Sequence, residues 1–83
     1  HVIDFFDLYQ PERNAIQQLL EQERHKILEL DASVQGFNIG NNAGVTAGQT
    51  VLHCHTHLIP RRVGDVDDPK GGIRGVIPGK QKY

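Results

Sequence analysis

Cysteine is scarce in this sequence, and neither sign of charge dominates it. Of the 83 residues only Cys54 is a cysteine, which excludes an intramolecular disulfide framework and suits a reducing, cytoplasmic environment. The formal net charge is −1 at pH 7. Such a balanced charge gives no electrostatic basis for stable binding of nucleic acid or of a membrane surface.

Long hydrophobic runs are also missing from the sequence. No apolar stretch approaches the roughly 20 residues that a membrane-spanning helix requires, and the first residues do not resemble a signal peptide. The sequence therefore predicts no membrane association. At this length we expect one domain at most, with a thin hydrophobic core to which partners or further segments often contribute.

A long helix is expected from about residue 11 to residue 30. Pro11 at a first helical position and Glu12 in the first turn are signals of a helix start. The charged residues are separated from one apolar stripe, which is typical of a surface helix that packs on a sheet. The apolar set that we assign to this helix consists of Ala15, Ile16, Leu19, Leu20, Ile27 and Leu28.

Two neighbouring antiparallel strands are expected after this helix, over about residues 37–41 and 49–59. Residues 31–36 have the composition of a loop that ends in a glycine, and a connection rich in glycine and asparagine separates the two strands. Pro60 cannot donate a ladder hydrogen bond and marks the expected end of the second strand. Residues 60–83 are rich in polar and turn-forming residues, so we predict an irregular tail.

The second predicted strand carries a row of alternating histidines. Because the side chains of a strand point to opposite faces with a period of two, His53, His55 and His57 share one face. A folding chain gains little by aligning three titratable rings, so the row requires a chemical explanation. Pairing with the first strand also brings the amides of Asn42 and Gln49 beside the first histidines. The opposite face is small and mostly apolar, and consists of Leu52, Cys54, Thr56 and Leu58.

Three uses of the histidine row compete, and the first is metal binding. Neutral imidazoles are common zinc ligands. The Cα atoms of His53 and His57 would lie ~13 Å apart in a strand, so one ion could meet all three rings only if the strand bent sharply. Cys54 points away from that face, and no second cluster of cysteine and histidine follows. A metal-dependent hydrolase stays an alternative, but we predict no metal and no other cofactor.

The second use is nucleophilic and acid–base chemistry by the imidazoles themselves. A histidine can form a covalent intermediate that divides one hard displacement into two easier steps. The Gln49 amide and the Thr50 hydroxyl could donate to a negatively charged oxygen, which suits a phosphoryl group. Arg61 and Arg62 add positive charge nearby, although both also fit a solvated strand end. The third use is none, an exposed polar strand face, which three strictly alternating histidines disfavour.

Residues 53–59, His-Cys-His-Thr-His-Leu-Ile, resemble the histidine-triad (HIT) motif, in which histidines alternate with apolar residues. Cys54 and Thr56 are less apolar than the residues usual at those positions of the motif. The resemblance covers essentially the whole chain, and the end of the sequence is similar to that of bacterial HIT-family hydrolases. The flanking segments that agree with the family are Gly36–Gly40, Ala47–Val51, Ile59–Arg62 and Gly71–Pro78.

The resemblance implies an α+β, HIT-like fold, in which an antiparallel sheet packs with a long helix, usually as a homodimer. Compared with that fold, residues 1–83 hold one partial domain, its C-terminal part, with the N-terminal strands absent. Such a piece exposes a sheet edge and apolar surface. We expect a second chain or further residues to cover them.

The family also implies a reaction, which is hydrolysis or transfer at the α-phosphate of a nucleotide conjugate such as a phosphoramidate or a dinucleoside polyphosphate. By resemblance, His55 is the nucleophile and forms a covalent nucleotidyl-histidine intermediate that water then cleaves. His57 contacts the phosphate and the leaving-group side, and His53 orients the site. A nucleotide-binding regulatory module with little turnover is the non-enzymatic alternative.

Other residues match substrate-contacting positions of the family. Gln49 and Thr50 correspond to positions that contact the phosphate, and Asn42 corresponds to an amide near the nucleotide. A fourth histidine of the family precedes the long helix, where His1 stands in this sequence. The resemblance therefore predicts a nucleotide substrate that is bound by residues upstream of the triad.

Overall fold

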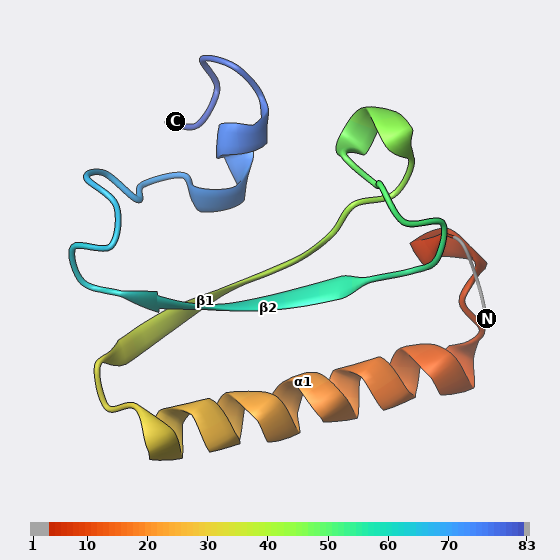
Figure 1. The fold of residues 1–83 in the computed structure, drawn as a ribbon, viewed down its shortest axis with the longest axis horizontal. Coiled ribbons are helices and arrows are strands. Elements are labelled where there is room, and N and C mark those ends of the chain that lie inside the picture. The colour runs from red at the N-terminus through yellow and green to blue at the C-terminus, as the bar shows by residue number, and fades with distance from the viewer. Residues whose placement is uncertain (1–3, 83) are drawn as a thin grey trace.

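In the computed structural model, which describes residues 4–82, one long helix lies along a two-stranded antiparallel sheet (Figure 1). The helix α1 spans Gln10–Leu30, and strands β1 and β2 span Val34–Asn41 and Thr56–Arg62. The α+β class that we predicted from the sequence is therefore confirmed. Short 3-10 turns occupy Phe5–Asp7, Val45–Ala47 and Gly72–Val76.

Helix α1 begins where a proline and an acidic residue signal a start. Pro11 lies in its first turn, and Glu12 Oε1 accepts a hydrogen bond of 2.7 Å from the Tyr9 backbone N–H, as in a capping box. The helix ends at Leu30, and Asp31 is its C-cap. These bounds agree with the helix predicted from about residue 11 to residue 30. Neither α1 nor any shorter helix within the described residues is long and apolar enough to cross a lipid bilayer.

Strand β1 begins earlier than the sequence indicated, because its first glycine lies at an irregularity of the ladder and does not end a loop. Val34 pairs with Arg62 and Gly36 pairs with Arg61, so the register shifts between these two pairs. Such a shift is a β-bulge, a place where glycine is common. Gly36 therefore belongs to β1, and the predicted loop is shorter than expected.

Strand β2 corrects the strand predicted over residues 49–59. It spans Thr56–Arg62, so residues 49–55 lie outside it and the strand continues past the proline. Pro60 pairs with Phe37 inside the ladder. The sheet formed by the described residues has only two strands, so each strand has an open edge. A proline is tolerated in such a strand, because the N–H that it lacks is not needed at the open edge. Pro60 therefore does not mark the strand end.

The hydrophobic core of the described residues is thin, as the chain length predicted. Among the hydrophobic residues described, only Leu8 and Val34 are buried, with 9% and 4% of their surface exposed. Leu19 on α1 is 56% exposed although it lines a cavity between the helix and β2. Ile39 on β1 is 50% exposed. The exposed apolar surface that we expected from the sequence is therefore present.

Ion pairs and hydrogen bonds of charged side chains link the end of β2 to the segment that follows α1. Arg62 donates to the Asp31 carboxylate at 2.7 Å and to the Ser33 hydroxyl at 3.1 Å. Arg61 forms a bidentate ion pair with Asp65, with N–O distances of 2.8 and 2.9 Å. Hydrogen bonds from Ser33 and Arg62 lower the pKa of Asp31 to about 2, and the Arg61 guanidinium lowers the pKa of Asp65. Both arginines therefore stabilise the strand end.

Candidate active site

The three histidines of the motif line one small cavity. Its volume is about 120 Å³, and His53, His55 and His57 all contribute to its wall. The rings of His53 and His55 are neighbours, with centroids 4.8 Å apart and planes inclined at 46°. The common face predicted from the two-residue period is therefore present, although only His57 lies within β2. The wall is completed by Asn42, Gly48, Gln49, Thr50 and Val51.

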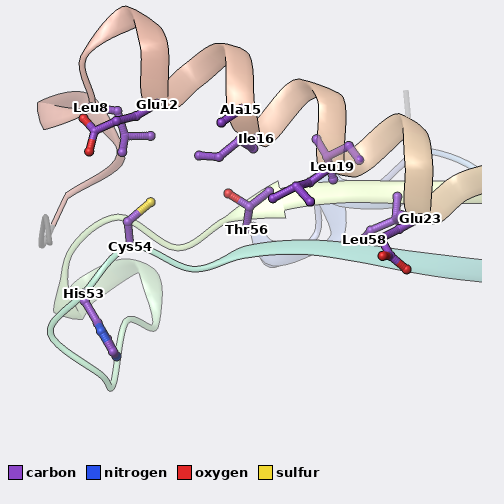
Figure 2. Close-up of a pocket in the computed structure, with 11 residues that line it drawn as sticks. Leu8, Glu12, Ala15, Ile16, Leu19, Glu23, His53, Cys54, Thr56 and Leu58 are labelled. Atoms are coloured by element: carbon purple, nitrogen blue, oxygen red, sulfur yellow. The ribbon is translucent and has the colours of Figure 1, made fainter.

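The side chains between the histidines point to the other side, toward α1. Cys54, Thr56 and Leu58 line a cavity of about 540 Å³ against the helix (Figure 2). Figure 2 shows the Cys54 sulfur directed toward the helix and the His53 ring directed away from it. Leu52, predicted on the same face as Cys54, lines neither of these two cavities and is 67% exposed. The histidine segment thus lies between a small polar cavity and a larger, mostly apolar one, and His53 borders both.

A tight loop carries the chain into the triad, and a glycine makes its geometry possible. The 3-10 turn Val45–Ala47 ends at Gly48, whose φ of 96° lies in the left-handed region that residues with a Cβ atom disfavour. A Cβ atom at this position would lie 3.6 Å from Asn42 Nδ2, in contact with that amide. The glycine of the Gly-Gln-Thr sequence is therefore explained by its backbone conformation.

Gln49 joins separate parts of this loop through its side chain. Its Oε1 accepts from the Gly44 N–H at 2.8 Å, and its Nε2 donates to the carbonyl oxygens of Val51 at 3.1 Å and His53 at 3.5 Å. We expected this amide to serve a phosphate oxygen, whereas in the structure it bridges the backbone of the loop. Gln49 thus lies in the cavity wall and also sets the path of the chain that leads to the triad.

The remaining predicted residues divide into those at the cavity and those elsewhere. Thr50 and Asn42 lie in its wall, in exposed positions that a ligand can reach. Arg61 and Arg62 do not line it, because their guanidinium groups are engaged by carboxylates at the far end of β2. His1, the candidate fourth histidine, lies outside the described residues.

Asn41 is a residue that the sequence interpretation missed. It is the last residue of β1 and pairs with Thr56 across the ladder. Its Nδ2 donates to the carbonyl oxygen of His55 at 2.6 Å and also lies 3.3 Å from both Cys54 Sγ and Thr56 Oγ1. The signal available in the sequence was the unusual polarity of the two residues between the histidines, which required a polar partner.

Comparison with known proteins identifies the family. The HIT domain family profile matches residues 1–64, so the chain belongs to the HIT domain family. Its predicted membership is thereby confirmed.

Three relatives illustrate the range of similarity within this family. An uncharacterized HIT-like protein of Mycoplasma genitalium is 36% identical over 61 residues, which cover 74% of this chain and 43% of that protein. The asymmetrical bis(5'-nucleosyl)-tetraphosphatase of Schizosaccharomyces pombe is 44% identical over 43 residues, covering 52% and 24%. The bis(5'-adenosyl)-triphosphatase of Saccharomyces cerevisiae is 34% identical over 68 residues, covering 81% and 32%. The chain thus spans less than half the length of these relatives.

A solved structure confirms the fold. The crystal structure of a zinc-bound histidine triad family protein from Mycobacterium smegmatis matches with a TM-score of 0.68 and 32% sequence identity. The match covers 78% of this chain and 47% of that one. The helix and the two strands described above are therefore arranged as in a HIT-like fold.

Zinc is part of that neighbour, which raises the question of a metal in this chain. Within residues 4–82, no group of three or more histidine, cysteine, aspartate or glutamate side chains is arranged to hold a metal ion. The Cys54 sulfur is directed toward α1, away from the cavity that His53 and His55 share (Figure 2). The described residues therefore do not fit a zinc site.

Proposed function

We propose that this chain carries the active site of a HIT-type nucleotide phosphohydrolase or phosphoramidase, which acts at the α-phosphate of nucleotide conjugates. The observation that carries the proposal is the convergence of His53, His55 and His57 on one cavity with Asn42 and Thr50. Two relatives are named as hydrolases of dinucleoside polyphosphates, which supports the same substrate class. A protein that only bound nucleotides would not need an imidazole aligned between two others.

His55 is assigned the role of nucleophile in this proposal. One of its ring nitrogens attacks the α-phosphorus and forms a P–N bond, while the bond from phosphorus to the leaving group breaks. The leaving group departs with the bonding electron pair and takes up a proton from solvent, on the side that we assign to His57, and the water of the second step returns a proton to solvent. Water then attacks the same phosphorus, the P–N bond breaks, and the nucleotide leaves with His55 restored.

Polar groups around the cavity bind and orient the phosphate. The Thr50 hydroxyl and the Asn42 amide border the space beside His55 and can donate to phosphate oxygens. Gln49 contributes by keeping these groups in place through its bonds to the loop backbone. His53, whose ring lies beside the ring of His55, orients the nucleophile. Positioning and charge stabilisation are the main requirements of phosphoryl displacement, and this arrangement supplies both.

The site is expected to work within a larger assembly. We propose that residues 1–83 form part of one HIT domain, that the protein is a cytoplasmic homodimer, and that it takes a nucleotide conjugate without stable nucleic acid binding. The exposed apolar surface at Leu19 and Ile39 supports a covering partner or further chain. His1 is proposed as a fourth histidine of the site.

Replacement of the nucleophile tests this function directly. His55→Ala is expected to lower the turnover of an adenosine phosphoramidate and of a dinucleoside polyphosphate by about 10³-fold or more, because no P–N intermediate can form. His25→Ala is the matched control, since His25 is an exposed helix residue paired with Glu29. Steady-state assays of both variants, with circular dichroism as a check of folding, decide the outcome.

Two results would replace this proposal with its rivals. Retained turnover in His55→Ala, lost with a chelator and restored by stoichiometric metal, would establish a metal-dependent hydrolase. Tight nucleotide binding without turnover, and without a covalent adduct on rapid quenching, would establish a regulatory binding module. The proposed function requires turnover that depends on His55 and withstands chelation.

A further inference from the structure

A small polar cluster lies directly behind the histidine segment, on the side that faces α1. Its centre is the Asn41 side chain, whose Nδ2 reaches the His55 carbonyl oxygen at 2.6 Å. The same nitrogen lies 3.3 Å from Cys54 Sγ and 3.3 Å from Thr56 Oγ1. We call these contacts the Asn41 cluster. Its three acceptors belong to consecutive residues, with His55 in the middle.

Asn41 lies at the end of the sheet, where its side chain can hold the backbone of His55. Asn41 and Thr56 are the last pair of the β1–β2 ladder, and β2 begins only at Thr56. The His55 peptide therefore lies one residue outside the regular ladder. The Asn41 side chain donates to that peptide as a further backbone partner would, and so holds the backbone from which the His55 ring reaches its cavity.

The cluster also explains why two positions between the histidines depart from the apolar pattern of the motif. Cys54 and Thr56 are half-buried against the helix, where a hydroxyl costs free energy unless it is hydrogen-bonded. The Asn41 amide nitrogen, with two N–H groups, lies within hydrogen-bond distance of Cys54 Sγ and Thr56 Oγ1 as well as of the His55 carbonyl oxygen. An asparagine in β1 and polar residues at these two positions therefore form one matched set.

We propose that Asn41 is a positioning residue, which holds the His55 backbone so that the His55 ring meets the phosphorus in line; this rests on the function proposed above. Asn41 lies outside the residues that line the histidine cavity, so it acts on the reaction through its neighbours, and its shortest contact is with the His55 carbonyl oxygen. A displacement of a nucleophile by about 1 Å can lower a rate by about 100-fold. The hydrogen bond to the His55 carbonyl oxygen is the contact that prevents such a displacement.

Asn41→Leu is the principal test, because leucine has a similar volume but no donor. It is expected to lower kcat by about 10- to 100-fold while KM changes less than about two-fold, since the groups that bind phosphate are untouched. Asn38→Leu is the matched control. Asn38 lies on the same strand and contacts Arg61 of β2, but it has no contact with the triad, so its kcat is expected to stay at the wild-type level.

A triple variant separates positioning of His55 from general stabilisation of the cluster. Asn41→Leu combined with Cys54→Val and Thr56→Val makes the cluster apolar, and the adjoining cavity of about 540 Å³ has room for the added methyl groups. The melting temperature is expected to recover relative to Asn41→Leu, whereas kcat stays low because the His55 carbonyl still lacks its donor. Recovery of kcat together with stability would overturn the proposal.

A measurement that does not depend on turnover keeps this proposal distinct from the hydrolase proposal. In ¹H–¹⁵N spectra of the imidazole groups, Asn41→Leu is expected to shift or broaden the His55 ring signals and to leave those of His25 unchanged. Unchanged His55 signals would refute positioning, whatever the activity. Absence of turnover in the wild-type protein would instead refute the hydrolase function, and the spectra would still decide whether Asn41 positions His55.

Discussion

At the scale of single residues, the groups proposed to do chemistry are distinct from the groups that shape the backbone around them. His55 lines the cavity that a phosphate would enter, whereas Gly48 and Gln49 set the path of the loop beside it. Asn41 lies behind the triad and binds its backbone. The short sequence from Gly48 to His57 therefore contains both the proposed chemistry and part of its support.

Gly48→Ala tests the part played by backbone geometry. A Cβ atom at φ 96° is strained, so we expect a loss of about 1–2 kcal/mol in the free energy of unfolding. Relaxation of this strain would move a loop that forms part of the histidine cavity wall, so turnover should also fall. Chemical denaturation and steady-state assays give the two values.

The control for that substitution is another glycine of the same chain. Gly36 lies in β1, its φ is not positive, and a Cβ atom there would meet nothing within 4 Å. Gly36→Ala should therefore change the free energy of unfolding by less than about 0.5 kcal/mol. Equal losses in the two variants would show that strain at Gly48 is not the cause.

At the scale of elements, periodicity located the helix and the shared face of the histidines but not the bounds of the strands. The two-residue period persists through His53 and His55 although neither lies in a strand, because their loop also directs alternate side chains to opposite sides. Pro60 and Gly36 are usual stop signals, yet an open edge and a bulge accommodate them within strands. Such tertiary circumstances cannot be inferred from local sequence.

The candidate site was predictable to a similar extent. The residues of the cavity wall follow from the motif and its upstream Gly-Gln-Thr. The bonds that Gln49 makes to Val51 and His53 depend on a loop conformation that composition does not specify. The contact between Asn41 and His55 joins residues far apart in the sequence, and only the strand register brings them together.

The link between β2 and α1 yields a prediction for pH dependence. Asp31 has a pKa lowered to about 2 by hydrogen bonds from Ser33 and Arg62, so its ionised form stabilises the folded state. This contribution is complete above the unfolded-state pKa of 3.8 and is lost as the pH falls through about 2. Asp31→Asn should therefore lower the melting temperature at pH 7, and the difference from wild type should vanish near pH 2.

Thermal melts of both proteins across this pH range provide the measurement. Because the side chains of Asp31 and Arg62 keep 39% and 43% of their surface exposed, the difference at pH 7 should also shrink in 1 M salt. Glu21→Gln, on the exposed surface of α1, is a control for loss of one carboxylate. A difference that stays constant from pH 7 to pH 2 would show that Asp31 acts through packing and not through charge.

At the scale of the whole molecule, the described residues form one layer of helix on a small sheet with little buried core. Leu8 and Val34 are its buried hydrophobic residues, while Leu19 and Ile39 keep half or more of their surface exposed. A face of this kind is stabilised when another protein surface covers it. The exposed residues therefore support the covering of this face either by a second chain, as in the proposed homodimer, or by further residues.

Sedimentation equilibrium tests the proposed assembly. We expect the mass of two chains at micromolar concentration, because the apolar surface at Leu19 and Ile39 favours association. Thermal stability should then rise with protein concentration. A monomer whose melting temperature is independent of concentration would contradict the homodimer and would leave the covering of this surface to further residues of the same chain.

The covalent intermediate on His55 is the most direct test of the proposed function. P–N bonds are labile in acid, so the reaction with an adenosine phosphoramidate is quenched in base and the protein is digested without acid. The modified residue is then identified by mass spectrometry. We predict one nucleotidyl group on His55, which forms within a single turnover and disappears as product accumulates. Turnover without any adduct, or an adduct on another residue that His55→Ala leaves intact, would contradict the proposed mechanism.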